Sequence, residues 1–385
     1  MIGTVRFRNN WRVFFWLFLI NPIDRLVMQF KRIPPRLSGV LIVRLDNIGD
    51  FALWATAGGQ LRNKYPASKY RITFLCNRAY FDLAKKVLPF DEFWPCDRDD
   101  FLSNPFYRLK LLARVRSAGF AEVINPVADH NLLREDSVVR VSGAEVRTGI
   151  FCEKPHDQPT VNRIVLPWYT QIIEQVEDPP WELERNFRIL DIITGGHNER
   201  KLLDLHQLRG ERPPALRNVG KYFVLAVGAY DPARAWPFSN FVELAKRISK
   251  SYEWTCVLCG NSRDLANSRE LSKLGFKSVN LIGKTSISEF ISILGSAEVV
   301  FSNESAALHL SASLGTKVIS IVGGGHFGRF VPYQDIGGST SPLVATKLMD
   351  CFNCGWLCRY PLVESSTYKC IAEISVQQVF DLLQK

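Results

Sequence analysis

The chain has 385 residues, enough for two domains of ordinary size, and its 46% hydrophobic and 22% charged residues exclude a largely disordered protein. Lys and Arg (48) exceed Asp and Glu (38), so the net charge of +10 favours anionic partners such as nucleotide-sugars, phosphorylated glycans or acidic lipids. The chain has no basic run interleaved with aromatic residues, so nucleic acid is not an expected partner.

Residues 1–36 form an amphipathic segment. An intense apolar run from Trp11 to Ile20 follows Arg6 and Arg8 and contains Arg12. The run is shorter than the ~20 apolar residues that a membrane-spanning helix needs, and no small-residue cleavage site of a signal peptide follows it. Two interpretations stay open: the segment lies on a membrane surface, or it is a helix docked on the protein's own surface.

The first domain, residues 37–207, opens with the stretch VLIVRLDNIGDFAL at residues 40–53. Its aliphatic run predicts a buried parallel strand, followed by a tight loop and a helix. Ligands of parallel α/β sheets bind at the carboxyl ends of strands, so we expect Asp50 at the edge of a site, although this aspartate could also simply cap the helix. Gly49 would let the backbone approach a ligand closely.

Strands and helices then alternate, which predicts a doubly wound parallel sheet. The predicted strands are residues 71–75, 92–94 and 121–124, and the predicted helices are residues 80–87 and 107–116. Residues 129–204 look less regular, and His130 with several arginines could bind an acceptor there, although a solvated surface is the favoured interpretation for any one of these residues. Asp97-Arg98-Asp99 is interpreted as a solvated acidic loop and not as a metal-binding motif.

Residues 208–220, LRGERPPALRNVG, predict a linker because prolines, glycine and polar residues dominate. The second domain, residues 221–385, repeats the alternation of strands and helices. Its predicted strands are residues 222–227, 255–258, 279–281, 299–301 and 318–322, and its predicted helices are residues 241–249, 265–274, 287–294, 306–313 and 374–383. Two such domains imply a ligand cleft between them, across which the last helix is expected to pack.

Three loops follow predicted strands of the second domain. The first carries Arg234 before a helix start, where a guanidinium and backbone N–H groups could bind a diphosphate. The second, residues 302–309, places a carboxylate at a helix start, and the third, residues 323–329, is rich in glycine. Because all three loops belong to one edge of one sheet, together they predict a site.

Five blocks stand out along the chain, namely RLDNIGD (44–50), RAWP (234–237), LIGKTSISE (281–289), SNESAALHLSASLGT (302–316) and GGGHFGRFVPY (323–333). Taken together, they resemble glycosyltransferase family 9, the lipopolysaccharide heptosyltransferases of the GT-B architecture. The resemblance covers the chain from residue 40 onward. It implies an α/β fold with two Rossmann-like, doubly wound domains, and an inverting transferase that moves heptose from ADP-heptose onto a lipid-linked, lipopolysaccharide-core or other cell-surface glycan.

The resemblance also implies roles for individual residues. Asp50 matches the proposed general base that deprotonates the acceptor hydroxyl, and Arg44, Asn47 and Gly49 of the same block are expected on the acceptor side. Arg234 matches the basic residue that contacts the donor diphosphate. The other expected donor-binding residues are Asn303, Glu304, Ser305, Ala306, His309, Gly323, Gly324, Gly325 and His326. No catalytic metal is required in this mechanism.

The chain departs from the family pattern at several of these positions. Arg234 stands where the family has a lysine, and residues 303–306 read Asn-Glu-Ser-Ala where the family has Asn-Asp-Thr-Gly. The family's Gly-Pro-Thr-Asp loop is Gly-Gly-Gly-His here, so an acidic position has become His326. These departures leave the donor sugar open.

Four of the nine cysteines cluster late in the chain, namely Cys351, Cys354, Cys358 and Cys370. The odd total and the absence of a convincing secretory signal favour a reduced, cytoplasmic compartment, with a peripheral place on the inner membrane if the N-terminal segment binds lipid. Four thiolates complete a tetrahedron, so a structural zinc site is one interpretation and free cysteines are the other.

Two other functional classes compete with a transferase. A nicotinamide-dependent Rossmann enzyme is disfavoured because Asp-Asn-Ile-Gly-Asp, and not Gly-x-Gly-x-x-Gly, follows the first strand. A non-catalytic nucleotide-sugar-binding protein, or a family member with a different donor, is compatible with the departures at Arg234, Glu304 and His326. Retention of Asp50 favours a transferase.

Overall fold

The computed structural model describes residues 16–31, 33, 36–151, 159–174, 181–265, 275–333, 341–362 and 367–385. The described chain divides into two compact units. The first takes its residues from 1–47, 54–179 and 185–199, and the second from 48–53, 180–184 and 200–385. The start of the helix that carries Asp50 therefore groups with the second unit, and the predicted linker at residues 208–220 lies inside that unit.

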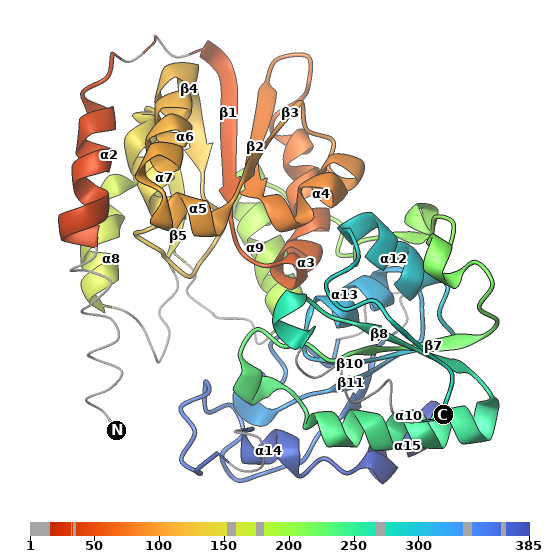
Figure 1. Ribbon diagram of the computed structural model, residues 1–385. Coiled ribbons are helices and arrows are strands. Elements are labelled where there is room, and N and C mark those ends of the chain that lie inside the picture. The colour runs from red at the N-terminus through yellow and green to blue at the C-terminus, as the bar shows by residue number, and fades with distance from the viewer. Residues whose placement is uncertain are drawn as a thin grey trace. The chain divides into compact units, whose positions relative to one another are not determined.

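The first unit holds a six-stranded parallel sheet in the order β3-β2-β1-β4-β5-β6 (Figure 1). Its strands are β1 (Arg36–Arg44), β2 (Arg71–Asn77), β3 (Glu92–Cys96), β4 (Phe120–Ile124), β5 (Val146–Phe151) and β6 (Gln171–Glu174). The chain winds outward from β1 and then from β4 in the opposite direction, which confirms the predicted double winding. Leu41, Ile42 and Val43 are fully buried, because a central parallel strand is covered on both faces.

The helices of this part of the chain are α2 (Asn21–Met28), α3 (Ile48–Gly59), α4 (Phe81–Val87), α5 (Arg98–Ser103), α6 (Pro105–Ala118), α7 (Glu135–Ser142), α8 (Pro159–Val165) and α9 (Glu182–Thr194). Residues 129–204 are thus more regular than predicted, with three helices and two strands. The prediction failed there because β5 (VRTGIF) and β6 (QIIE) are short and carry charged or polar residues, so their hydrophobic period is faint.

Asp97 corrects a second prediction. The expected solvated acidic loop is the start of α5, where the Asp97 side chain accepts hydrogen bonds from the backbone N–H groups of Asp99 (3.1 Å) and Asp100 (3.2 Å). An aspartate at this position satisfies backbone donors that have no partner inside the helix. The acidic pair is therefore part of a helix cap.

The second unit holds another six-stranded parallel sheet, in the order β12-β11-β10-β7-β8-β9 (Figure 1). Its strands are β7 (Tyr222–Ala226), β8 (Thr255–Cys259), β9 (Ser278–Asn280), β10 (Val299–Asn303), β11 (Val318–Ile321) and β12 (Leu343–Ala345). Its helices are α10 (Phe238–Tyr252), α12 (Ile287–Gly295), α13 (Ala306–Ser313), α14 (Lys369–Ala372) and α15 (Val376–Leu383). The edge strand β12 was not predicted, and most of the predicted helix at residues 265–274 lies outside the described residues.

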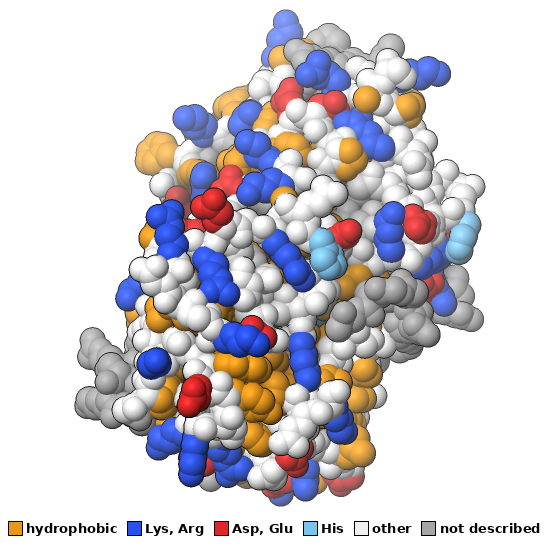
Figure 2. Space-filling view, turned by 90° about the vertical axis from the view of Figure 1, so that its right-hand side faces the viewer, with side chains coloured by type: hydrophobic (Ala, Val, Ile, Leu, Met, Phe, Trp, Pro, Cys, Tyr) orange, Lys and Arg blue, Asp and Glu red, His pale blue; other side chains and the backbone are white. Residues whose placement is uncertain are grey.

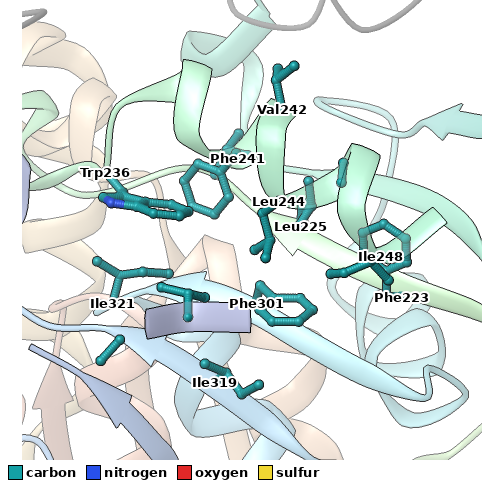
Figure 3. Close-up of a cluster of buried hydrophobic side chains, with 14 of the residues drawn as sticks. Phe223, Leu225, Trp236, Phe241, Val242, Leu244, Ile248, Phe301, Ile319 and Ile321 are labelled. Atoms are coloured by element: carbon teal, nitrogen blue, oxygen red, sulfur yellow. The ribbon is translucent and has the colours of Figure 1, made fainter. Parts of the chain in front are cut away.

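The core of this unit packs α10 and α15 against the sheet. Figure 3 shows side chains of α10, such as Leu244 and Ile248, beside those of the strands. Trp236 is 2% exposed, packs edge-on against Phe241 at 5.0 Å, and donates its Nε1–H to the carbonyl of Ile374 at 2.9 Å. The last helix, expected to pack across a cleft, packs against α10, β11 and β12 of its own unit. Trp236 therefore fixes the loop that carries Arg234 to the core.

Helix α2 is docked on α6 and α7 of the first unit by a buried ion pair. Asp24 is fully buried, and Arg108, which is 1% exposed, donates to its carboxylate at 2.9 and 3.1 Å. Ser137 completes the cluster through the same carboxylate. Residues 21–28 thus form a helix docked on the protein's own surface, which is one of the two interpretations of the segment. Residues 1–15 of the predicted amphipathic segment lie outside the described residues.

The outward side of this segment is apolar and basic. Leu26 and Phe30 are 48% and 40% exposed, and Arg25 and Lys31 are exposed beside them. Among the helices that the structure describes, none has the length and apolarity that crossing a membrane requires. On the face shown in Figure 2, Lys and Arg side chains are spread widely and do not gather into one patch.

We predict that Asp24→Ala lowers the free energy of unfolding by about 3–5 kcal/mol, because it leaves the buried Arg108 guanidinium without its counter-charge. Urea unfolding followed by circular dichroism measures the change. Asp82→Ala, at an exposed position in the first turn of α4, is the control and should cost less than about 1 kcal/mol. Equal small losses in both variants would contradict the importance of the ion pair.

Candidate functional site

The site lies in the second unit, at the carboxyl ends of β7, β10 and β11. These three strands are neighbours in the sheet, and the chain reverses its winding direction between β7 and β10. Such a reversal is the usual place for a ligand in an open parallel sheet. The three loops predicted from the sequence all leave this edge.

Arg234 ends a short 3-10 turn, residues 232–234, that follows β7. The turn is held by the Asp231 side chain, which accepts the N–H of Ala233 at 3.0 Å, and by Tyr368, which donates its N–H to the Ala233 carbonyl at 2.9 Å. Burial lowers the pKa of Arg234, while Asp231 and Glu304 act to raise it. Its Nε is buried and has no hydrogen-bond partner among the described residues, so the guanidinium can serve an incoming anion.

Glu304 directly follows β10. Burial raises the pKa of its carboxyl from 4.5 to about 7, against the opposing charges of Arg234 and Arg329 and with help from Asp50. Its Oε2 is buried, without a hydrogen-bond partner in the part of the chain that the structure describes. Near neutral pH this carboxyl is therefore present both as an acid that donates and as a carboxylate that accepts.

Asn303 and His309, both expected to bind the donor, are engaged inside the protein. Asn303 is fully buried, accepts the N–H of Trp236 at 2.9 Å and donates to the Val227 carbonyl at 2.8 Å. The Nδ1 of His309 lies 2.8 Å from the Tyr333 hydroxyl, and burial lowers the pKa of the imidazole to about 4. In this arrangement both residues position the loops, while Ser305 and Ala306 are half-buried at the start of α13.

The glycine triplet has a steric explanation. A Cβ on Gly325 would lie 2.3 Å from the Trp356 ring, one on Gly324 would lie 2.5 Å from Phe352, and one on Gly323 would lie 2.8 Å from Trp356. All three distances are far below ordinary van der Waals contact. The triplet makes room for the cysteine-rich segment that starts near residue 349, and His326 meets the same Trp356 edge-to-face at 5.8 Å.

Gly49 and Asp50 lie on the first turn of α3, within the segment that groups with the second unit. A Cβ on Gly49 would lie 3.2 Å from the His309 ring and 3.6 Å from the Ala306 backbone, so glycine permits close approach to α13. Asp50 acts electrostatically on Glu304. The structure therefore brings Asp50, Arg234 and Glu304 into one electrostatic group.

Arg44 and Asn47, expected on the acceptor side, belong to the first unit. Arg44 is buried, forms a salt bridge to Asp46 at 2.6 Å and lies over the Trp54 ring at 5.1 Å. The Oδ1 of Asn47 accepts a hydrogen bond from Arg98 at 3.1 Å. Both side chains brace the loop after β1.

Two residues beside the site had no role assigned to them from the sequence. Arg329 forms a salt bridge to Glu182 at 2.9 Å and acts electrostatically on Glu304; its place in the third loop was the only hint. Trp356 lies over the Arg234 guanidinium, with its ring centroid 4.3 Å from Cζ. Only its position two residues after Cys354 could have drawn attention to Trp356.

The four late cysteines gather around one small cavity of about 10 Å³, lined also by Gly324, Met349, Trp356, Tyr360 and Tyr368. The sulfur of Cys354 accepts the backbone N–H of Trp356, and that of Cys370 accepts the N–H of Gly324 at 3.5 Å. Within the described ranges, no group of three or more His, Cys, Asp or Glu side chains is placed so that it could hold a metal ion.

Known proteins resemble this chain in sequence. The family model of glycosyltransferase family 9 (heptosyltransferase) matches residues 146–341, about half of the chain. Lipooligosaccharide heptosyltransferase 2 of Campylobacter jejuni is 29% identical over 133 residues, which cover 34% of this chain and 42% of that protein. The match thus spans less than half the length of this relative.

Solved structures resemble it in fold. The ADP-heptose lipopolysaccharide heptosyltransferase II of Escherichia coli gives a TM-score of 0.63 at 16% identity, over 90% of this chain and 97% of that chain. The iron-containing dodecameric glycosyltransferase TibC of enterotoxigenic Escherichia coli gives 0.53 at 14% identity, over 92% and 77%. At these identities the likeness shows the fold alone, and it confirms the expected GT-B fold class.

We predict that Glu304→Gln stabilises the protein in a pH-dependent way. The folded pKa of about 7 exceeds the ordinary value of 4.5, so the folded chain holds the extra proton and wild-type stability falls as the pH rises between these values. The Gln variant should exceed the wild type by about 1–3 kcal/mol in urea unfolding at pH 8, and by much less at pH 5. Glu243→Gln, exposed on α10, should give the same difference at both pH values.

Proposed function

Because the chain belongs to glycosyltransferase family 9 and is therefore a glycosyltransferase, we propose that it transfers heptose from ADP-heptose to a lipopolysaccharide-core or other cell-surface glycan. The observation that carries the proposal is the grouping of Asp50, Arg234 and Glu304 at the carboxyl edge of the second sheet. A buried guanidinium Nε and a buried carboxyl oxygen both lack partners among the described residues there. These groups suit a diphosphate and a sugar hydroxyl.

Asp50 would act as the general base. It would take the proton from the acceptor hydroxyl while that oxygen attacks the anomeric carbon of the donor. The bond between the anomeric carbon and the phosphate oxygen breaks, and its electron pair leaves with the nucleoside diphosphate. A single displacement of this kind inverts the configuration at the anomeric carbon.

Arg234 would stabilise the negative charge that develops on the leaving diphosphate. A guanidinium in a partly desolvated loop acts more strongly than one in water, because the surrounding dielectric is lower. Glu304, with its pKa near 7, would supply a hydrogen bond to the donor sugar or phosphate. The positions expected on the acceptor side, Arg44, Asn47 and Gly49, remain assigned to the acceptor in this proposal.

The identity of the donor rests on the relatives. The Campylobacter jejuni relative is named a lipooligosaccharide heptosyltransferase, and the fold neighbour from Escherichia coli is named for ADP-heptose. We propose that this chain likewise transfers heptose and uses ADP-heptose as its donor. The departures at Arg234, Glu304 and His326 make another nucleotide-sugar the second candidate.

We also propose a peripheral place on the cytoplasmic face of the inner membrane. The exposed apolar residues Leu26 and Phe30, together with the cationic Arg25 and Lys31, suit contact with anionic lipid. A lipid-linked acceptor would be presented at such a surface.

We further propose that Cys351, Cys354, Cys358 and Cys370 hold a structural metal ion. The cavity between them has about the space that one water molecule or ion needs, and two of the sulfurs already accept backbone N–H groups. Metal binding would draw the thiolates into a tetrahedron, as expected where binding and local folding are coupled. Zinc suits four thiolates, and the fold neighbour TibC is named as containing iron.

We predict that Asp50→Asn lowers kcat by about 10²–10⁴-fold while ADP affinity changes little, because it removes the base and leaves the diphosphate site intact. The assay follows ADP release from ADP-heptose, with GDP-, UDP- and dTDP-sugars in parallel and a lipopolysaccharide-core acceptor presented in anionic vesicles. Asp99→Asn, on α5, is the control and should retain wild-type turnover.

Release of a different nucleotide would support a glycosyltransferase that uses another nucleotide-sugar as its donor. Equal turnover with and without vesicles would remove the membrane part of the proposal. A wild-type protein that turns over none of these donors would contradict the proposed reaction.

We predict about one bound zinc or iron ion per purified chain, measured by elemental mass spectrometry, because four thiolates fill a tetrahedral site. Cys354→Ser and Cys370→Ser should each lose most of it. Cys96→Ser, at a buried cysteine of the first unit, should keep it. Metal contents that do not differ between these variants would contradict the site.

A further inference from the structure

The cysteine-rich segment supplies an aromatic side chain to the candidate site. Trp356 lies between the glycine triplet and Arg234, on a segment that the family blocks do not include. Resting on the proposed function of Arg234 as the donor-diphosphate ligand, we propose that Trp356 is a positioning residue. Its indole holds the Arg234 guanidinium in the orientation that binds the diphosphate.

The contact is of the kind that orients a guanidinium. The Cζ of Arg234 lies 4.3 Å from the Trp356 ring centroid, well within the range of cation–π attraction. Stacking on a ring face fixes the plane of the guanidinium and leaves its N–H groups free to bind a planar or forked anion. A long arginine side chain would otherwise lose rotamer entropy when it binds a ligand, and holding it beforehand removes part of that cost.

Trp356 is itself held by packing. Its ring lies against Gly325 and Gly323, where any Cβ would collide with it, and 5.2 Å from the Tyr368 ring. The N–H of Gly355 donates to the Gly325 carbonyl at 3.0 Å, which ties the two segments together. An indole fixed on one side by packing can orient a mobile side chain on the other.

The backbone of this segment carries strain. Trp356 has a φ of +64°, in the left-handed region that bulky L-residues rarely adopt, and its neighbour Gly355 has a φ of +59°. A non-glycine residue such as Trp356 keeps this conformation only where its surroundings enforce it, and such residues concentrate at functional sites. The strain here places the indole beside Arg234.

The indole also has an unused polar group. The Nε1–H of Trp356 is buried and has no hydrogen-bond partner among the described residues, although a buried tryptophan usually finds one. The Nε of Arg234 and the Oε2 of Glu304 are likewise buried without a hydrogen-bond partner among the described residues. Arg234 and Glu304 act on each other electrostatically, so their two unsatisfied groups indicate a place that a polar ligand completes.

Calorimetry with ADP tests the inference on the full chain. Trp356→Leu should weaken ADP binding about 10-fold, within the range of a partly desolvated cation–π contact, and Trp356→Phe should restore most of the affinity because a ring face remains. In steady-state kinetics the Leu variant should raise the donor KM and also lower kcat, because Arg234 both binds the diphosphate and stabilises the charge that develops on it. A residue needed only for folding would lower the amount of active protein without moving KM.

Trp254→Leu is the matched control. Trp254 stacks on Tyr252 at 4.6 Å in the same unit and precedes β8, so it lies at the amino-terminal edge of the sheet. This variant should bind ADP like the wild type. The double variant Trp356→Leu/Arg234→Ala should bind no more weakly than Arg234→Ala alone, because the indole acts through the guanidinium.

Wild-type affinity in Trp356→Leu, or additive losses in the double variant, would overturn the inference while the proposed function stands. If the wild type binds no nucleotide, the proposed function fails instead. The contact itself can then still be tested by nuclear magnetic resonance. The signal of the Arg234 Nε–H is identified by its loss in Arg234→Lys, and its chemical shift decides whether Trp356 holds Arg234. We expect a ring-current shift in the wild type that disappears in Trp356→Leu, and its absence from the wild type would refute the contact.

Discussion

The buried amide of Asn303 is the interaction on which the candidate site depends. It accepts a hydrogen bond from the Trp236 backbone and donates one to Val227, so it joins the ends of β7 and β10 where the sheet reverses its winding. A fully buried amide must satisfy both its donor and its acceptor, and these bonds do so at fixed positions. Arg234 lies two residues before Trp236 and Glu304 follows Asn303, so this amide sets the separation of the two loops.

Charge balance at this edge follows from burial. Arg234 and Glu304 are both desolvated, which makes the guanidinium easier to deprotonate and the carboxyl harder to ionise. Arg329, which forms a salt bridge to Glu182, lowers the pKa of Glu304, and the negative charge of Asp50 raises it. The result is a carboxyl with a pKa near 7 beside a guanidinium cation, which is an environment suited to an anionic ligand.

Steric constraint explains why the third loop departs from the family pattern. The Gly-Gly-Gly-His loop carries no side chain at its first three positions because Phe352, Trp356 and Ile371 occupy that space. The cysteine-rich segment therefore packs where side chains at these loop positions would otherwise lie. A non-glycine residue there would be destabilising, since a Cβ within 3 Å of a fixed aromatic ring forces the packing apart.

The sequence by itself determined the parallel α/β architecture, most strands and helices of both sheets, and the three loops at one edge, because hydrophobic period and turn residues are local properties. It missed the strands β5, β6 and β12, which are short and weakly patterned, and the helices α5, α7, α8 and α9. It also could not show that Asn303 and His309 form hydrogen bonds inside the protein, or that the glycine triplet lies against Phe352 and Trp356. Only the tertiary structure brought Trp356, 122 positions after Arg234, onto its guanidinium, because contacts between distant segments leave no trace in local sequence.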